Sequence, residues 1–197
     1  KAGGTLVNKD SFFNGTELNN EKDGTLTNEK DGKLTYRITV TNSGTLNNYG
    51  NLVSTNAGRQ DWSDPTILTN DGTLNNYGTI ENVANTTLTN NGTLDNDATL
   101  NNDGTLNNNA GGTLTNNGNL SSSGTLTNND NLTNSGTLTN YGYLYQNRKL
   151  YNSGTLTNNA DGTLNNKRTL DNDGRLINKG TLSNNRSLRN EDRLYNL

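Results

Sequence analysis

A leucine recurs at every sixth residue along most of this chain, and an asparagine stands two positions after almost every one of these leucines. The repeating unit is Gly-Thr-Leu-x-Asn-x, as at residues 92–97, 124–129 and 154–159. A fixed short period indicates that one structural unit is stacked on copies of itself. A rod built in this way offers regular surface and length but few places for a unique catalytic pocket.

The low apolar content would by itself suggest disorder. Only 26% of the residues are hydrophobic, against roughly 45–50% in ordinary globular domains. Disorder also requires a high net charge, and here the net charge is only −3. The apolar residues are also spaced evenly, about one in six, so the chain needs few of them provided that each is buried.

A period of six residues does not fit a helix, whose turns would spread the leucines over every face. It fits a short strand followed by a corner, with Thr outward, Leu inward and Asn in the turn, where Asn is a favoured residue. The glycine two positions before each leucine faces the same inner side, where little room is left. We therefore expect an all-β fold, a single parallel β-solenoid of six-residue repeats with occasional eight-residue corners.

The eight-residue corners bear on the number of strands in each coil. We call the inward aliphatic residue of each repeat its anchor. The long corners separate Ile80 from Leu88, Leu106 from Leu114 and Leu156 from Leu164. Counted in anchors, the second long corner begins four after the first, and the third begins eight after the second. The segment at residues 44–50 recurs at 72–78, again four anchors later if the irregular gap between them hides one. This phasing favours two or four strands per coil over three, and handedness stays open.

We expect residues 1–197 to form one continuous solenoid. Residues 1–67 are a less regular section with a surface loop at 53–67, which holds the only proline, and 68–197 are the regular section.

The regular asparagines are predicted to be structural. Stacked coil upon coil, their amides can each donate to the next, forming ladders. The four anchors without a following Asn have Tyr36, Ser54, Ser122 and Gln146 in its place. The clearest candidate ladder residues are Asn96, Asn102, Asn108, Asn116, Asn128, Asn134, Asn140 and Asn158.

Two groups of outward side chains are candidate surface contacts. Three Thr-x-Thr pairs stand at 12-residue spacing, and a 12-residue coil would align them into a flat rank like the surface of β-solenoid ice-binding proteins: Thr113, Thr115, Thr125, Thr127, Thr137 and Thr139. Four tyrosines within eleven residues form a strip that can stack on sugars or on a neighbouring rod: Tyr141, Tyr143, Tyr145 and Tyr151.

Other chemistry finds little support. Cysteine and histidine are absent, which removes thiol chemistry and the usual transition-metal ligands. The pairs Asp95/Asp97 and Asp171/Asp173 are interpreted as solvent-facing substitutions, so no cofactor or metal is expected. Base-stacking aromatics do not interleave with the basic residues, and no stretch is long and apolar enough to span a membrane. We expect neither nucleic-acid binding nor membrane insertion.

Charge is segregated along the chain. Residues 69–147 hold six acidic and no basic side chains, whereas 148–197 hold nine basic against five acidic ones. The repeat also runs to both ends of the sequence, and unpaired strand edges recruit further strands. Self-association into a filament or a longer rod, end to end or laterally, is therefore expected.

With these repeats the chain resembles hexapeptide-type β-helix tracts and the Asn/Gly/Thr-rich solenoid regions of bacterial surface adhesins and extracellular fibres. The acyltransferases and carbonic anhydrases of the hexapeptide class rely on histidine, so their activities are not implied here. The resemblance implies an extracellular or cell-surface, non-enzymatic structural protein, a fibre subunit or adhesin stalk. The alternative is a binding module that uses a flat Thr- and Tyr-bearing face for carbohydrate or ice.

Overall fold

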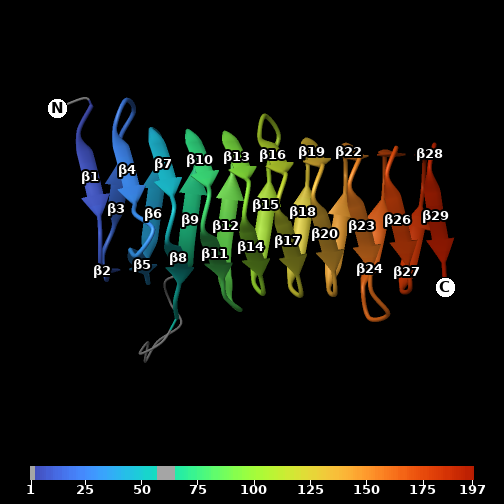
Figure 1. Ribbon diagram of the computed structural model, residues 1–197, viewed down its shortest axis with the longest axis horizontal. Helices are drawn as coiled ribbons and strands as arrows, with labels where there is room; N and C mark the ends of the chain where they lie inside the picture. Colours follow the sequence, from blue (N-terminus) through green and yellow to red (C-terminus); the bar gives the residue numbers. More distant parts are fainter. Residues whose placement is uncertain (1–2, 57–64) are drawn as a thin grey trace.

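The computed structural model describes residues 3–56 and 65–197. These residues form 29 short strands and no helix. The strands lie side by side along a single rod, with the two termini at opposite ends (Figure 1). The prediction of an all-β parallel solenoid is confirmed.

The strands belong to three parallel sheets, and successive strands along the chain pass from one sheet to the next. Sheet A consists of β1 (Thr5–Asn8), β4 (Thr25–Asn28), β7 (Thr45–Asn48), β10 (Thr73–Asn76), β13 (Thr93–Asn96), β16 (Thr113–Asn116), β19 (Asn131–Asn134), β22 (Lys149–Asn152), β25 (Thr169–Asn172) and β28 (Ser187–Asn190). Sheet B consists of β2 (Ser11–Asn14), β5 (Lys33–Tyr36), β8 (Asn51–Ser54), β11 (Thr79–Asn82), β14 (Thr99–Asn102), β17 (Asn119–Ser122), β20 (Thr137–Asn140), β23 (Thr155–Asn158), β26 (Arg175–Asn178) and β29 (Arg193–Asn196). Sheet C consists of β3 (Leu18–Asn20), β6 (Thr39–Asn42), β9 (Thr66–Asn70), β12 (Thr86–Asn90), β15 (Thr105–Asn108), β18 (Thr125–Asn128), β21 (Tyr143–Gln146), β24 (Thr163–Asn166) and β27 (Thr181–Asn184).

Each coil therefore contains three strands, and the prediction of two or four was wrong. The eight-residue corners do not all lie at the same corner of the coil. The long connections after Ile80 and after Leu156 lie between sheets B and C, whereas the one after Leu106 lies between sheets C and A. Because any corner can take the extra pair of residues, the spacing of long corners does not measure the coil.

The recurrence of residues 44–50 at 72–78 has the same explanation. The first copy contains β7 and the second β10, which are neighbours in sheet A with Leu46 paired to Leu74. Only β8 and β9 lie between them. Among the described residues the two copies are thus three anchors apart, at Leu46, Leu52, Leu68 and Leu74.

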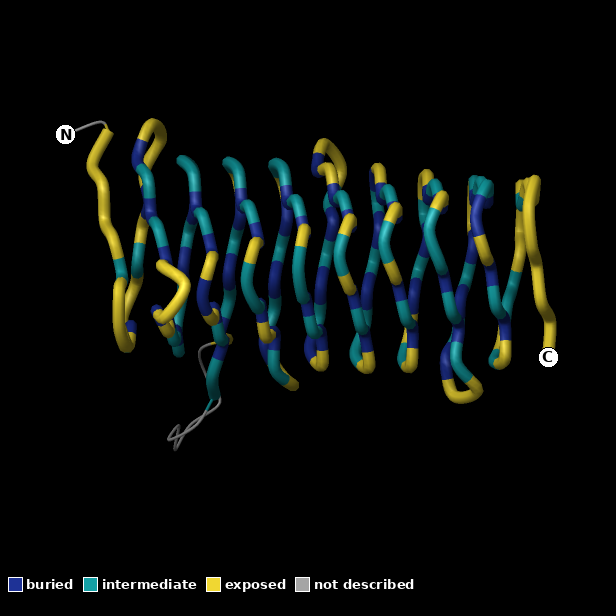
Figure 2. Tube along the Cα trace, viewed as in Figure 1, coloured by how far each residue is buried: buried dark blue, intermediate teal, exposed yellow. Residues whose placement is uncertain are grey.

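The leucines form the interior. Strand register pairs leucine with leucine in every sheet, as Leu94 with Leu114 and Leu114 with Leu132. From Leu26 to Leu176 every anchor is at most 2% exposed, and buried segments recur along the rod between its two end coils (Figure 2). Burial of a leucine side chain contributes about 1.5–3 kcal/mol, so the column is the main apolar contribution to stability. At the rod's two ends Leu6 and Leu194 are about two-fifths exposed, at 41% and 39%.

Glycines let successive corners stack closely. A methyl group on Gly124 would overlap the carbonyl oxygen of Gly104 in the preceding coil, and Gly154 stands in the same relation to Gly136. Backbone φ at these glycines is not positive. The requirement is therefore one of space between coils rather than of an unusual backbone conformation.

The predicted loop at 53–67 is described only in part. Val53 and Ser54 belong to β8, and β9 begins at Thr66. Residues 57–64 lie outside the described residues. The division of the chain into an irregular section up to residue 67 and a regular one after it stays a prediction.

Candidate functional site

The last residue of most strands carries an inward asparagine, and these side chains form ladders along the rod. The Asn96 amide nitrogen donates to Asn116 Oδ1 at 2.7 Å and to the Asn119 carbonyl at 3.0 Å, both in the next coil. It also lies 3.3 Å from the Ala98 carbonyl of its own corner. A buried amide thus finds partners in its own coil and in the next, which offsets its desolvation.

The prediction of asparagine ladders is confirmed, and the eight residues named for them are each 0% exposed. They divide among three ladders, one for each sheet, because successive asparagines along the chain lie in different sheets. Those in sheet A are Asn96, Asn116 and Asn134; those in sheet B are Asn102, Asn140 and Asn158; those in sheet C are Asn108 and Asn128.

Residues that replace asparagine affect the ladders differently. Gln146 accepts the Asn128 amide at its Oε1, at 2.7 Å, and its own amide donates to the Thr169 carbonyl at 3.3 Å. Ser122 Oγ accepts a hydrogen bond from the Asn102 amide at 3.1 Å but donates none to Asn140. The buried Oδ1 of Asn140 has no hydrogen-bond partner among the described residues. Ser54 pairs instead with the Thr86 hydroxyl, at 2.8 Å.

Tyr36 occupies a ladder position with a side chain too large to join the ladder. Its ring is fully buried, and its hydroxyl completes no hydrogen bond with any described residue. Burial raises the pKa of Tyr36 strongly, and the nearby Ser54 hydroxyl opposes that shift only in part.

The three Thr-x-Thr pairs do not form a common rank. Thr113 and Thr115 lie on sheet A, Thr125 and Thr127 on sheet C, and Thr137 and Thr139 on sheet B. The expected rank assumed a coil of 12 residues. Residues that pair in register are instead 18 or 20 apart, as Leu114 with Leu132 and Leu94 with Leu114.

The four candidate tyrosines fall into two locations. Tyr143 and Tyr145 lie on the outer face of β21 with ring centroids 5.9 Å apart and nearly parallel planes, and Tyr141 precedes that strand at the corner between sheets B and C. Tyr151 lies on sheet A, where its hydroxyl donates to Asp173 Oδ2 at 2.9 Å. That hydrogen bond, together with the negative charge of Asp173, raises the pKa of Tyr151.

The paired aspartates are held by neighbours on the surface. Asp97 accepts from the Asn117 side chain at 2.8 Å, and Asp173 accepts from Tyr151. Within residues 3–56 and 65–197, no three acidic side chains gather into a group suited to a metal ion. Asp97 and Asp173 therefore act as ordinary hydrogen-bond acceptors of the outer surface.

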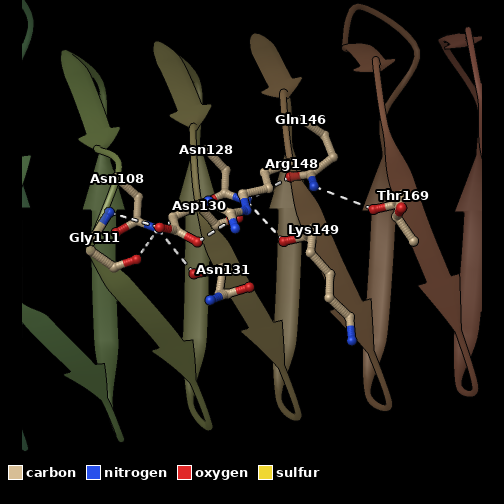
Figure 3. A network of polar contacts seen from close by, with 10 residues as sticks. Asn108, Gly111, Asn128, Asp130, Asn131, Gln146, Arg148, Lys149 and Thr169 are labelled. Atoms are coloured by element: carbon tan, nitrogen blue, oxygen red, sulfur yellow. Dashed lines mark hydrogen bonds and ion pairs between the residues drawn. The ribbon is translucent and has the colours of Figure 1, made fainter.

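A polar network crosses the corner between sheets C and A (Figure 3). Asp130 stands where the preceding coils of this corner have glycine, and it accepts the Gly111 backbone N–H at 2.7 Å. Its other oxygen lies 3.6 Å from Arg148 Nε in the next coil. The Asn128 side chain donates to the Asp130 carbonyl, at 2.8 Å, and to that of Lys149, at 2.9 Å. The carboxylate thereby joins three successive coils.

Three arginines follow Asp130 at this same corner in successive coils. Arg148, Arg168 and Arg186 each precede the first residue of a sheet A strand. This basic column places part of the C-terminal excess of positive charge along one edge of the rod. The six-residue repeat does not reveal this column, because its members are 20 and 18 residues apart.

A hollow of about 270 Å³ lies at the first coils and is lined by residues of β1, β3 and β4. Leu6, Leu18 and Leu26 form its apolar part, and Glu21 is the only ionisable side chain in its lining. A single carboxylate supplies no pair of groups for acid and base catalysis. No helix in the described part of the chain has the length and apolar character needed to cross a membrane.

Comparison with known proteins identifies a family. The family model described as haemagglutinin repeat matches residues 2–64, 65–98, 87–147 and 142–196. No curated protein and no solved structure matches the chain.

Proposed function

Because the chain belongs to the haemagglutinin repeat family, we propose that it is a non-enzymatic structural segment of an extracellular adhesin, a stalk or fibre rather than a catalyst. Haemagglutinin repeats are typical of secreted and surface adhesins. The Asn/Thr/Gly-rich composition without cysteine or methionine is compatible with that setting.

The observation that carries this proposal is the unbroken repetition of one cross-section. In sheet A a column of leucines and an unbroken ladder of asparagines, from Asn8 to Asn190, run through all ten strands. At about 4.8 Å for each coil, that stack is about 45 Å long. Each added coil lengthens such a solenoid by the same amount. This property suits a spacer that holds another part of an adhesin away from the cell surface.

Self-association of rods is the finer part of the proposal. The side-chain amides in the ladders donate toward the next coil along the chain, as from Asn76 to Asn96 and from Asn96 to Asn116. The ladders therefore have a direction, and a second rod stacked in the same direction continues them. The acidic stretch at 69–147 and the basic one at 148–197 also allow staggered lateral contact.

Electron microscopy of the purified chain, combined with sedimentation over a series of ionic strengths, tests both parts. We expect thin rods with a far-ultraviolet spectrum of β-structure, and an association that weakens as salt screens the charges. Globular particles or an unstructured chain would overturn the stalk. Rods whose mass stays that of one chain at every salt concentration would overturn self-association alone.

A second candidate function is carbohydrate binding by the tyrosine pair on sheet C. Tyr143 is 51% exposed and stacks beside Tyr145 on a flat strand, and exposed aromatic rings pack well against the apolar faces of sugars. In a glycan-binding assay, Tyr143→Ser with Tyr145→Ser should abolish binding while the rod stays folded. The double variant Tyr49→Ser and Tyr77→Ser is the matched control, because it removes the other stacked pair, at a corner. Equal binding by both double variants would contradict a site on β21.

A further inference from the structure

The outer surface of sheet C differs from those of the other two sheets. From β6 to β27 its outward side chains include no charged group, whereas sheet A carries Asp95 and Lys149 outward and sheet B carries Glu81 and Arg175. We call the outward residues of β6, β9, β12, β15 and β18 the threonine face. Its members are Thr39, Thr41, Ile67, Thr69, Thr87, Thr89, Thr105, Asn107, Thr125 and Thr127.

Strand register arranges these side chains in two straight columns. Thr39, Ile67 and Thr87 follow one another in the first column, which continues through Thr105 to Thr125. The second column begins at Thr41 and ends at Thr127. Of the six threonines in the predicted rank, only Thr125 and Thr127 belong to this face. The alignment of the other members requires the three-stranded coil.

The hydroxyls of the face are available to solvent. Two inward-facing threonines of sheet C, Thr66 and Thr86, donate their hydroxyls to backbone carbonyls of the described protein. Those of the threonine face donate to no other described protein group, and their residues are half-buried beside one another. Each hydroxyl offers one donor and two acceptor lone pairs to water.

The array is also held rigidly from beneath. The sheet C ladder runs under it through Asn42, Asn70, Asn90 and Asn108, with amide hydrogen bonds of 2.7–2.8 Å. The face therefore repeats at about 4.8 Å between strands and about 6.7 Å along each strand. These repeats are close to those of the oxygen atoms on a prism face of hexagonal ice.

A second copy of the chain is a poor occupant for this surface. Five strands and two columns cover roughly 25 by 10 Å, or about 250 Å² on each copy, whereas a stable protein interface needs about 800 Å² on each partner. Tyr143 and Tyr145 rise from the next strand, β21, and end the flat area there. The surface is too small and too bounded for a face-to-face dimer.

We propose that the threonine face binds ice. A rigid array of hydroxyls fixes water molecules in a lattice, and because the protein side is already ordered, little further entropy is lost when the crystal forms on it. The methyl groups fill the spaces between those waters. The charged side chains of sheets A and B instead hold strongly oriented hydration shells that do not match a crystal.

The test compares the full chain with single variants that place a bulky side chain on one sheet at a time. Thr87→Tyr puts a ring at the centre of the threonine face. Thr79→Tyr puts the same ring at the equivalent outward position of β11, in the same coil but on sheet B. Tyrosine is tolerated at this position of a strand, as Tyr143 shows. The readouts are inhibition of ice recrystallisation and binding of fluorescently labelled protein to a single ice crystal.

We expect the unmodified chain and Thr79→Tyr to be equally active. Thr87→Tyr should require at least about tenfold more protein for the same inhibition of recrystallisation. A tenfold change corresponds to a loss of about 1.4 kcal/mol of binding free energy. If Thr87→Tyr fails to fold, Thr105→Tyr on β15 tests the same face, with Thr99→Tyr on β14 as its control. Inactivity of the unmodified chain in both assays, or equal losses in the face and control variants, would overturn the proposal. Neither result would affect the proposed stalk, which rests on the shape of the rod.

Discussion

Asn102 donates its side-chain amide to Ser122 Oγ at 3.1 Å, and the sheet B ladder stops at that serine. The next member, Asn140, pairs with Ser122 in strand register, yet its buried Oδ1 receives no hydrogen bond from any described residue. One short side chain thus separates the Asn82–Asn102 part of the sheet B ladder from the part that runs from Asn140 to Asn196.

Replacing that serine should therefore stabilise the rod. Ser122→Asn supplies the missing donor to Asn140, and a hydrogen bond that satisfies a buried acceptor is worth about 1 kcal/mol. We expect the free energy of unfolding to rise by that amount in urea titrations followed by circular dichroism. Ser121→Asn is the control: it adds the same side chain at an outward position, next to Asn101 in register, and should change stability by less than about 0.5 kcal/mol. Equal effects of the two variants would contradict the ladder gap.

Removing an intact ladder residue should have the opposite effect. The Asn116 amide donates to Asn134 Oδ1 at 2.7 Å and to the Thr137 carbonyl at 2.9 Å, and its Oδ1 accepts from Asn96. Asn116→Ala leaves these buried groups unpaired, at a cost of about 1–3 kcal/mol for each unsatisfied group. We expect the coils around β16 to lose hydrogen-exchange protection first. The neighbouring Asn117→Ala, at an exposed corner, should leave protection unchanged, and similar losses in both variants would argue against the ladder as the cause.

The inward and outward positions of this fold could be predicted from sequence because they follow from the six-residue period alone. Thr, Leu and Asn occupy the same places in a strand whether a coil has two, three or four sides. Leu94 and Asn96 both face inward and are buried, and these positions follow from four consecutive residues.

The number of strands per coil could not be predicted in the same way, since it depends on which residues meet after a full turn. Long corners after Ile80 and after Leu106 lie at different corners, so their spacing misled the count. Every prediction that depends on the number of residues in a full coil was affected. The Thr113 and Thr125 pairs were grouped wrongly, and neither the threonine face nor the basic column was predicted. Both are aligned only at the 18- and 20-residue separations of a full coil.

Close packing of the corners gives a further prediction. Gly124→Ala places a methyl group against the backbone carbonyl of Gly104, which cannot move aside without disturbing the coil before it. We expect a loss of about 1–3 kcal/mol, typical of overpacking, measured by thermal unfolding. Gly4→Ala is the control, because the added group would meet no atom within 4 Å. An unchanged unfolding temperature for Gly124→Ala would show that the corners stack less tightly than this geometry requires.

Tyr36 should make the rod sensitive to alkali. Its ring is buried and its pKa is raised well above the ordinary value of about 10. The unfolded chain therefore loses the phenolic proton at a lower pH than the folded chain does. The stabilising contribution of this shift is fully present below about pH 10, and it falls by about 1.4 kcal/mol for each further pH unit until the folded tyrosine also ionises. Urea titrations at pH 9 and pH 11 should show this loss of stability. Tyr36→Phe should make the loss smaller, because it removes the buried hydroxyl. That hydroxyl completes no hydrogen bond with the described residues. Tyr49→Phe removes an exposed hydroxyl and should leave the loss intact; if Tyr49→Phe and Tyr36→Phe behave alike, burial of Tyr36 is not its cause.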